Sequence, residues 1–341
     1  MPQPPRVFEP DRLYFITQRT FQSRLFLRPS AALNGIVGGV LARALSLHSV
    51  ELFAFIIMSN HVHFIMRGEV GQISRFMNYF SGMVGYRVGK LVGWQGKFWH
   101  SSYAAAPILD DDALAAKVRY VISHGVKEGL VEHSEEWPGL GSIPELVHGK
   151  KRDFAWDDRT AKWDAALRKK QHAIEDKKYP LRLKTLPIWS DYSQEKQRNS
   201  AKQALLDGET QGRAMREAQG SLGVGKILAQ DPLSQPRATK RGPRPSCHAT
   251  TAEIREAFLN SRRNTLNSYQ GASRRWRDGF IAEFPRGTFR PPTSCEWPLH
   301  SPAYTAPDRV VSLEDSAKWI PPGPWMEIGR SERTVIDALP I

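Results

Sequence analysis

The stretch LFAFIIMSNHVHFIM, residues 52–66, decides the fold of this chain. Its first seven residues predict a buried strand, Ser59-Asn60 predicts a turn, and residues 61–66 predict a second strand. Because side chains alternate along a strand, His61 and His63 share one face. Two imidazoles ~7 Å apart on one face can bind a single divalent metal ion. For such a pair alone, two ordinary histidines near a strand start remain the simpler interpretation.

The charge of the chain favours a polyanionic partner. The 341 residues suffice for one large domain or two ordinary ones, and they carry a formal net charge of +13. Residues 1–150 hold 15 Lys+Arg against 12 Asp+Glu, whereas the remainder holds 33 against 23. This balance favours nucleic acid over a membrane surface.

Cysteine content and hydropathy limit the remaining classes of protein. Cys247 and Cys295 are the two cysteines, so a disulfide framework or a cysteine-based zinc site is not expected. The first residues, MPQPPR, contain no apolar signal segment. The longest uninterrupted apolar run, residues 52–58, is far too short to span a membrane. We expect a cytoplasmic protein with no membrane partner.

Apolar spacing predicts an α+β arrangement for residues 1–150. Strands and helices alternate in the order strand, helix, strand, strand, helix, strand, helix, which is typical of a ferredoxin-like antiparallel sheet with helices on its faces. Besides the two strands of the opening stretch, the predicted strands are 12–18 and 98–108, and the predicted helices are 31–47, 72–91 and 113–123.

The sequence changes character after residue 150. Residues 151–300 predict a basic, mostly helical extension, with helical patterns at 151–178, 193–220 and 252–276. A basic, Pro-rich linker is predicted at 231–245, and an irregular tail at 301–341. We therefore expect a domain over 1–150, followed by this extension.

A second group of reactive side chains lies in the last predicted helix of the domain. Tyr120 and His124 are four residues apart and share one helix face. A tyrosine hydroxyl can be a covalent nucleophile, and the histidine can bind metal. Alternatively, Tyr120 is a core residue and His124 interacts with the helix dipole. Tyr79 and Tyr86 are rival tyrosines, but a packing or surface role suits them better.

These motifs, in their order, resemble those of the REP-associated tyrosine transposases, a group of the single-tyrosine transposases with a His-hydrophobic-His (HUH) signature. SNHVH at 59–63 carries the signature. It is followed by GKFW at 96–99, YVISHGV at 120–126 and GLV at 129–131. The resemblance covers about residues 10–150. Two departures are His124, where the family usually has Asn or Gln, and Gly125, where it has Pro.

The resemblance implies an HUH endonuclease/transposase core in a bacterial, nucleoid-associated protein. Tyr120 would be the nucleophile, and His61, His63 and His124 would hold Mg²⁺ or Mn²⁺. The activity would be nicking and strand transfer of single-stranded DNA beside a hairpin or repeat, through a 5′-phosphotyrosine. Family context favours a monomer, although a dimer is an alternative.

Basic and aromatic residues of the domain are candidates for DNA binding by phosphate contact and base stacking. For each of them, a solvated charge or a core aromatic is an equally good interpretation. The candidates are Arg67, Arg75, Arg87, Lys90, Lys97, Tyr103 and Arg119, with Trp94 and Trp99 as further stacking surfaces.

Three other functions remain open at this point. A domesticated protein of the same fold could bind DNA without cleaving it, and His124 would be the clue. A replication initiator or relaxase would share the tyrosine chemistry, but such proteins usually place the histidine motif after the tyrosine or carry a second tyrosine. A zinc hydrolase would leave Tyr120 as a passive neighbour.

Overall fold

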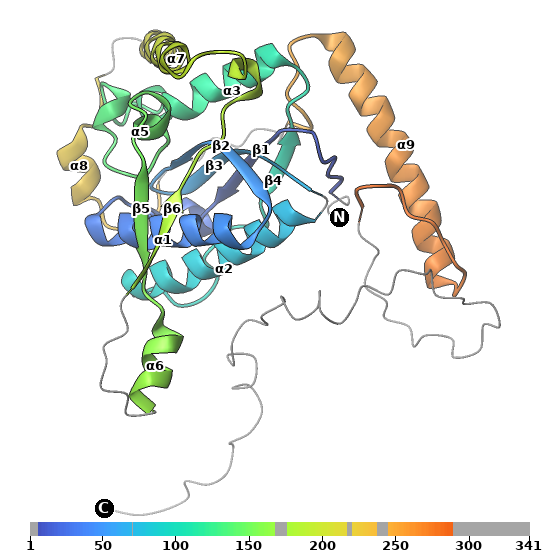
Figure 1. The fold of residues 1–341 in the computed structure, drawn as a ribbon, viewed down its shortest axis with the longest axis horizontal. Coiled ribbons are helices and arrows are strands. Elements are labelled where there is room, and N and C mark those ends of the chain that lie inside the picture. Colours follow the sequence, from blue (N-terminus) through green and yellow to red (C-terminus); the bar gives the residue numbers. More distant parts are fainter. Residues whose placement is uncertain (1–5, 70, 168–175, 217–219, 237–244, 289–341) are drawn as a thin grey trace, which may run out of the picture. The chain divides into compact units, whose positions relative to one another are not determined.

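The computed structural model describes residues 6–69, 71–167, 176–216, 220–236 and 245–288 (Figure 1). Its centre is a four-stranded antiparallel sheet in the order β2-β3-β1-β4. In this sheet β1 pairs with both β3 and β4, and β2 pairs with β3. The strands are β1 (Tyr14–Arg19), β2 (Val50–Ile57), β3 (His61–Gly68) and β4 (Ala104–Pro107). This order, with helices between β1 and β2 and between β3 and β4, confirms the predicted ferredoxin-like α+β fold.

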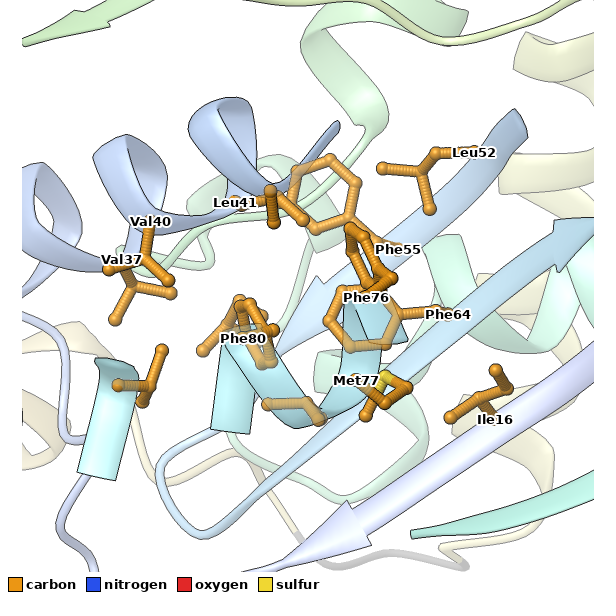
Figure 2. Close-up of a cluster of buried hydrophobic side chains, with 14 of the residues drawn as sticks. Ile16, Val37, Val40, Leu41, Leu52, Phe55, Phe64, Phe76, Met77 and Phe80 are labelled. Atoms are coloured by element: carbon orange, nitrogen blue, oxygen red, sulfur yellow. The ribbon is translucent and has the colours of Figure 1, made fainter. Parts of the chain in front are cut away.

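Helices α1 (Ala31–Leu47) and α2 (Gln72–Leu91) pack against one face of the sheet. The Ser30 side chain accepts a hydrogen bond from Leu33 N and begins α1. Figure 2 shows side chains of both helices meeting those of the strands in a fully buried cluster. Phe64 of β3 meets Phe80 edge to face at a centroid distance of 5.1 Å. This layer holds the β2–β3 hairpin in place.

The opposite face of the sheet is covered by α3 (Asp111–Ile122) and the short α4 (His124–Lys127). Asp110 begins α3 by accepting a hydrogen bond from Ala113 N at 2.7 Å. Helix α7 (Gln194–Ala214) then packs on α3 and α4 from outside. The candidate chemistry therefore lies between this face of the sheet and α3.

The extension is not purely helical. The helical pattern of residues 151–178 is wrong at both ends, where a two-stranded sheet, β5 (Arg152–Trp156) and β6 (Lys177–Leu181), packs on α1. Trp156 and Leu181 are buried there, and each strand has only five residues, too few for a two-residue period to be recognised among charged neighbours. The other elements are the 3₁₀ turns Phe21–Ser23, Ser134–Glu136 and Pro187–Trp189, and the helices α5 (Ile143–Leu146), α6 (Arg159–Leu167), α8 (Val224–Ala229) and α9 (Ala252–Arg277).

Most predicted elements of the core are confirmed with small shifts at their ends. The helices at 31–47 and 72–91 are as predicted, whereas the strand predicted at 98–108 shortens to β4 because Trp99 forms only an isolated bridge with Thr20. Part of the predicted linker, residues 237–244, and the whole predicted tail lie outside the described residues. Among the helices that the structure describes, none is long and apolar enough to cross a membrane.

Candidate active site

The β2–β3 hairpin sets the direction of the two histidines. Met58 N donates to His61 O at 2.8 Å and closes the turn at Ser59-Asn60. Val62 belongs to the core beneath α1 and α2, whereas His63 faces the opposite side, where α3 lies. The alternation predicted from the sequence is therefore confirmed, with both imidazoles toward α3.

The three predicted histidines come together in one cluster. His61 Nε2 lies 2.8 Å from His124 Nε2. The three ring centroids are 4.9 to 5.1 Å apart, and one ligand nitrogen of each residue lies within 4.8 Å of the others. His63 and His124 are 4% and 1% exposed. Two residues of β3 and the first residue of α4 thus converge on a single buried point.

Two polar side chains orient the rings from behind. The Asn60 side-chain oxygen lies 2.6 Å from His61 Nδ1, and because that oxygen only accepts, Nδ1 carries the proton. The lone pair of His61 Nε2 is then directed into the cluster. The Thr17 hydroxyl lies 2.9 Å from His63 Nδ1, since Thr17 of β1 is opposite His63 in the sheet. Such outer partners are typical of metal-binding histidines.

The cluster fits a divalent metal ion. His63 Nε2 and His124 Nδ1 are buried and form no hydrogen bond with a described residue, which is costly unless another partner binds there. Burial, with a smaller contribution from Arg19, lowers the pKa of His61 to about 3. Burial also lowers the pKa values of His63 and His124 well below their usual range. All three rings are therefore neutral near pH 7, which is the form that binds metal.

Tyr120 lies directly beside this cluster. Its ring centroid is 4.6 Å from that of His124 and 5.4 Å from that of His63. Burial raises the pKa of Tyr120 to about 12, so its hydroxyl is protonated at neutral pH. The ring nevertheless remains partly exposed to solvent. A phenol is thus held between the histidine cluster and the surface.

Several residues at the site were not predicted from the sequence. Phe15 of β1 stacks on His63 at 4.9 Å, a contact that depends on strand register. The Nζ atoms of Lys127 and Lys117 lie 4.3 and 5.4 Å from the centroid of the Tyr120 ring. Lys117 is three residues before Tyr120 and Lys127 is seven after it, a helical spacing that could have been noticed. His248, from the extension, meets Phe15 edge to face at 5.3 Å.

The predicted DNA contacts divide by exposure. Arg87 and Tyr103 are buried: the Arg87 guanidinium donates to Asp157 O at 2.7 Å, and the Tyr103 hydroxyl lies 3.0 Å from Ser74 Oγ. Both side chains therefore have partners inside the fold, and their contact with DNA stays a prediction. Arg75, Lys90 and Lys97 are exposed. Arg67 is partly exposed and pairs with Glu51 at 2.6 Å. The other partly exposed candidates are Arg119, Trp94 and Trp99.

The fold and the cluster together define an α+β domain in which a His-Val-His strand meets a third histidine and a tyrosine. Residues 32–124 match the family described as IS200-like transposases, and this range contains all three histidines and Tyr120. The resemblance carried by the sequence motifs is thereby confirmed over this range. No curated protein matches the chain significantly.

Two solved structures are similar to parts of the chain. One is a REP-associated tyrosine transposase bound to a REP hairpin, with 16% identity and a TM-score of 0.38, covering 43% of this chain and 86% of that one. The other is a Deinococcus radiodurans R1 protein assigned as a transposase, with 17% identity and a TM-score of 0.26, covering 36% and 97% of the two chains.

Proposed function

We propose that this chain nicks single-stranded DNA and transfers the cut strand, with Tyr120 as the nucleophile. The observation that carries the proposal is the ring contact between one partly exposed phenol and a cluster of three neutral imidazoles. The family match over residues 32–124 supports transposase-like chemistry. The net charge of +13 supports a nucleic-acid substrate.

The proposed reaction is a transesterification at phosphorus. The Tyr120 oxygen attacks the scissile phosphate, and the bond from phosphorus to the 3′-oxygen breaks. The phenolic proton passes to water, and the leaving 3′-oxygen takes up a proton from water. The products are a 5′-phosphotyrosyl protein and a free 3′-hydroxyl. Because the phosphodiester energy is kept in the new bond, a later 3′-hydroxyl can rejoin the strand without ATP.

The residues around Tyr120 have distinct parts in this reaction. A divalent cation held by His61, His63 and His124 would polarise a non-bridging phosphate oxygen. Such a set of neutral imidazoles favours Mn²⁺ over Mg²⁺ on intrinsic grounds. Lys117 and Lys127 bring positive charge to the phosphate beside the phenol.

The substrate we propose is single-stranded DNA beside a hairpin or repeat, bound by a monomer. The order of the motifs supports this choice. The exposed Arg75, Lys90 and Lys97 are available for phosphate contacts. One observation favours a second candidate function, DNA binding without cleavage. His124 stands where the family that the sequence resembles usually has Asn or Gln.

Formation of a covalent protein–DNA product tests the proposal. Purified protein is incubated with labelled hairpin oligonucleotides that carry single-stranded flanks, with Mn²⁺ or Mg²⁺, and analysed by denaturing electrophoresis. We expect a shifted band that requires metal and is lost in Tyr120→Phe. Tyr86→Phe is the matched control, because Tyr86 is an exposed helical tyrosine outside the cluster. Tight binding without such a band would instead support the non-cleaving function.

A further inference from the structure

Helix α9 carries several positive charges that are not paired with acidic side chains of the described residues. Its 26 residues contain six arginines and two glutamates. No arginine of this helix forms an ion pair with another described residue. Five of the six are exposed, and Arg262 is partly exposed. Their charge is therefore free to interact with a partner.

Most of these arginines lie along one side of the helix. At about 100° per residue, five of the six fall within an arc of roughly 120°. From Arg255 to Arg277 this stripe extends ~33 Å along the axis, at 1.5 Å per residue. Asn267 and Gln270 lie on or beside the same side, which also carries Glu256 and the partly buried Leu259 and Leu266. The arginine stripe consists of Arg255, Arg262, Arg263, Arg274 and Arg277.

The adjoining apolar side of α9 is covered by the chain that follows the helix. Phe284 meets Tyr269 and Trp276 at centroid distances of 5.5 and 6.3 Å. Ala272 and Ala282 are buried in the same region. The C-terminal half of α9 thus has its own small core, and the arginine stripe is left open.

Both ends of this segment are attached to the transposase-like domain. Thr250 N donates to Asp110 Oδ2 at 2.8 Å, so the carboxylate that begins α3 also holds the start of α9. His248 N donates to Pro107 O at 2.8 Å, beside β4. At the other end, Phe8 N donates to Gly287 O at 3.1 Å. The arginine stripe is therefore fastened at its base to the helix that carries Tyr120.

The segment that begins α9 lies between the first arginines of the stripe and the cation nearest to Tyr120. The charges of Arg255 and Arg262 act on the Cys247 thiol, opposing the rise in its pKa that burial causes. Next along the chain, the ring of His248 lies near Lys117, whose ammonium lowers the pKa of His248 in addition to the larger effect of burial. Lys117 in turn lies 5.4 Å from the centre of the Tyr120 ring. Cationic groups thus lie on both sides of Cys247 and His248, with the arginines of α9 on one side and Lys117 on the other.

We propose that the arginine stripe binds the phosphate backbone of a double-stranded DNA stem, while the adjoining single strand enters the Tyr120 site. This inference rests on the proposed function for the location of the single strand. The stripe is about as long as one turn of B-form DNA, roughly 34–36 Å. Guanidinium groups suit phosphate contacts, and such contacts need no base sequence.

Binding measurements on the full chain test the inference without any chemistry. Fluorescence anisotropy is recorded in EDTA, over a range of salt concentrations, with a labelled hairpin that carries a single-stranded flank and with the flank alone. The variant is Arg263→Gln/Arg274→Gln/Arg277→Gln, which retains good helix formers. We expect about tenfold weaker hairpin binding and a salt slope shallower by about two to three, with the flank alone bound as before.

A matched variant removes the same charge elsewhere. Lys184→Gln/Lys202→Gln/Lys226→Gln changes three exposed lysines of the extension outside α9 and should leave hairpin binding nearly unchanged. Equal losses in both variants, or an equal loss for hairpin and flank, would overturn the stem assignment. Because EDTA removes metal-dependent cleavage from the assay, a chain that forms no covalent product can still support the stripe. If the chain forms the covalent product but the arginine variant binds the hairpin as tightly as the native chain, this inference is refuted and the proposed function is not.

Discussion

At the scale of single residues, the site depends on side chains that hold the imidazoles from behind. Thr17 reaches His63 only because β1 and β3 pair in the register that places them opposite each other. Asn60 sets the proton position of His61 through one hydrogen bond of 2.6 Å. Neither residue needs to touch the substrate, yet both determine which lone pairs point inward.

Thr17→Val tests this positioning at nearly constant shape. Valine suits a strand but lacks the hydroxyl that orients His63 Nδ1. We expect Mn²⁺ affinity to fall about 10–100-fold, as for other outer partners of metal ligands, with a similar melting temperature of the metal-free protein. Calorimetric titration measures the affinity, and Thr17→Ser is the control because it keeps the hydroxyl. Unchanged Mn²⁺ binding in Thr17→Val would contradict a positioning role.

The main side chains of the site could be predicted from the sequence because local periodicity alone aligns them. His61 and His63 are two apart on a strand. Tyr120, near the end of α3, and His124, at the start of α4, are four apart, as on the single helix that was predicted. Phe15 and Thr17 could not be predicted, since they meet His63 only through strand register. The contact of Arg87 with Trp156 could not be predicted either, because the two residues are distant in sequence; the structure places the guanidinium 3.8 Å from that ring centre.

At the scale of helices and strands, the contact of α7 with α3 depends on a missing side chain. A Cβ atom on Gly208 would lie 2.5 Å from Ser123 Oγ and 2.7 Å from Ser123 Cβ. Ser123 directly follows α3 and precedes His124. The close approach of these helices therefore bears on the position of one histidine of the cluster.

Gly208→Ala should destabilise the protein although alanine is the better helix former. Helix propensity gains at most about 1 kcal/mol, whereas overpacking a close contact costs about 1–3 kcal/mol. Gly82→Ala is the matched control, because a Cβ there meets nothing within 4 Å, and it should stabilise by about 0.5–1 kcal/mol. Denaturant unfolding measures both. Stabilisation by both substitutions would show that α7 moves aside without cost.

The docking of the extension beside β4 should weaken in acid. Burial first, and Lys117 second, lower the pKa of His248 to about 4, so the folded protein prefers the neutral ring. An unfolded histidine titrates near 6.5, so this stabilisation is complete above about pH 6.5 and is lost as the pH falls toward 4.

The measurement for this prediction is the melting temperature at pH 7 and pH 5. It should fall further in the native chain than in His248→Phe, which keeps a ring against Phe15 but cannot be protonated. The three histidines of the cluster contribute equally to both proteins, so the difference reports on His248. Identical pH dependence would refute the assignment.

Elements with strong apolar periodicity were predictable, and elements of the extension were less so. The helices at 31–47 and 72–91 present a continuous apolar face to a sheet, which their sequences display directly. Strands β5 and β6 have five residues each and contain several charged or polar side chains, so their sequences show no clear period. Their packing against α1 appears only in the folded chain. Tertiary packing decides such weak local patterns.

At the scale of the molecule, the extension completes both layers of the core. Trp156 and Leu181 are buried in the layer of α1 and α2, and Leu186, Leu205 and Ile227 are buried in the layer of α3. Residues 1–150 would expose these contact surfaces if separated from the rest. The domain boundary predicted at residue 150 stays a prediction, which a fragment can test.

A fragment of residues 1–150 should not fold cooperatively, because it loses buried apolar partners on both faces. A fragment of residues 1–291 retains these partners and should unfold in a single cooperative transition. Circular dichroism and calorimetry measure both fragments. A sharp calorimetric transition in the 1–150 fragment would show that the shorter piece is an independent domain.

The strand order also imposes a sequence of events during synthesis. β1 leaves the ribosome first, yet Tyr14 pairs with Met66 on one side and with Pro107 on the other. Long-range pairing of this kind slows folding, because a long loop must close before its contacts form. The nascent chain therefore carries β1 without neighbours until much of the domain has been translated. Helix α3, which carries Tyr120, can dock only after β1 has paired within the sheet. The histidine cluster is therefore assembled late in folding.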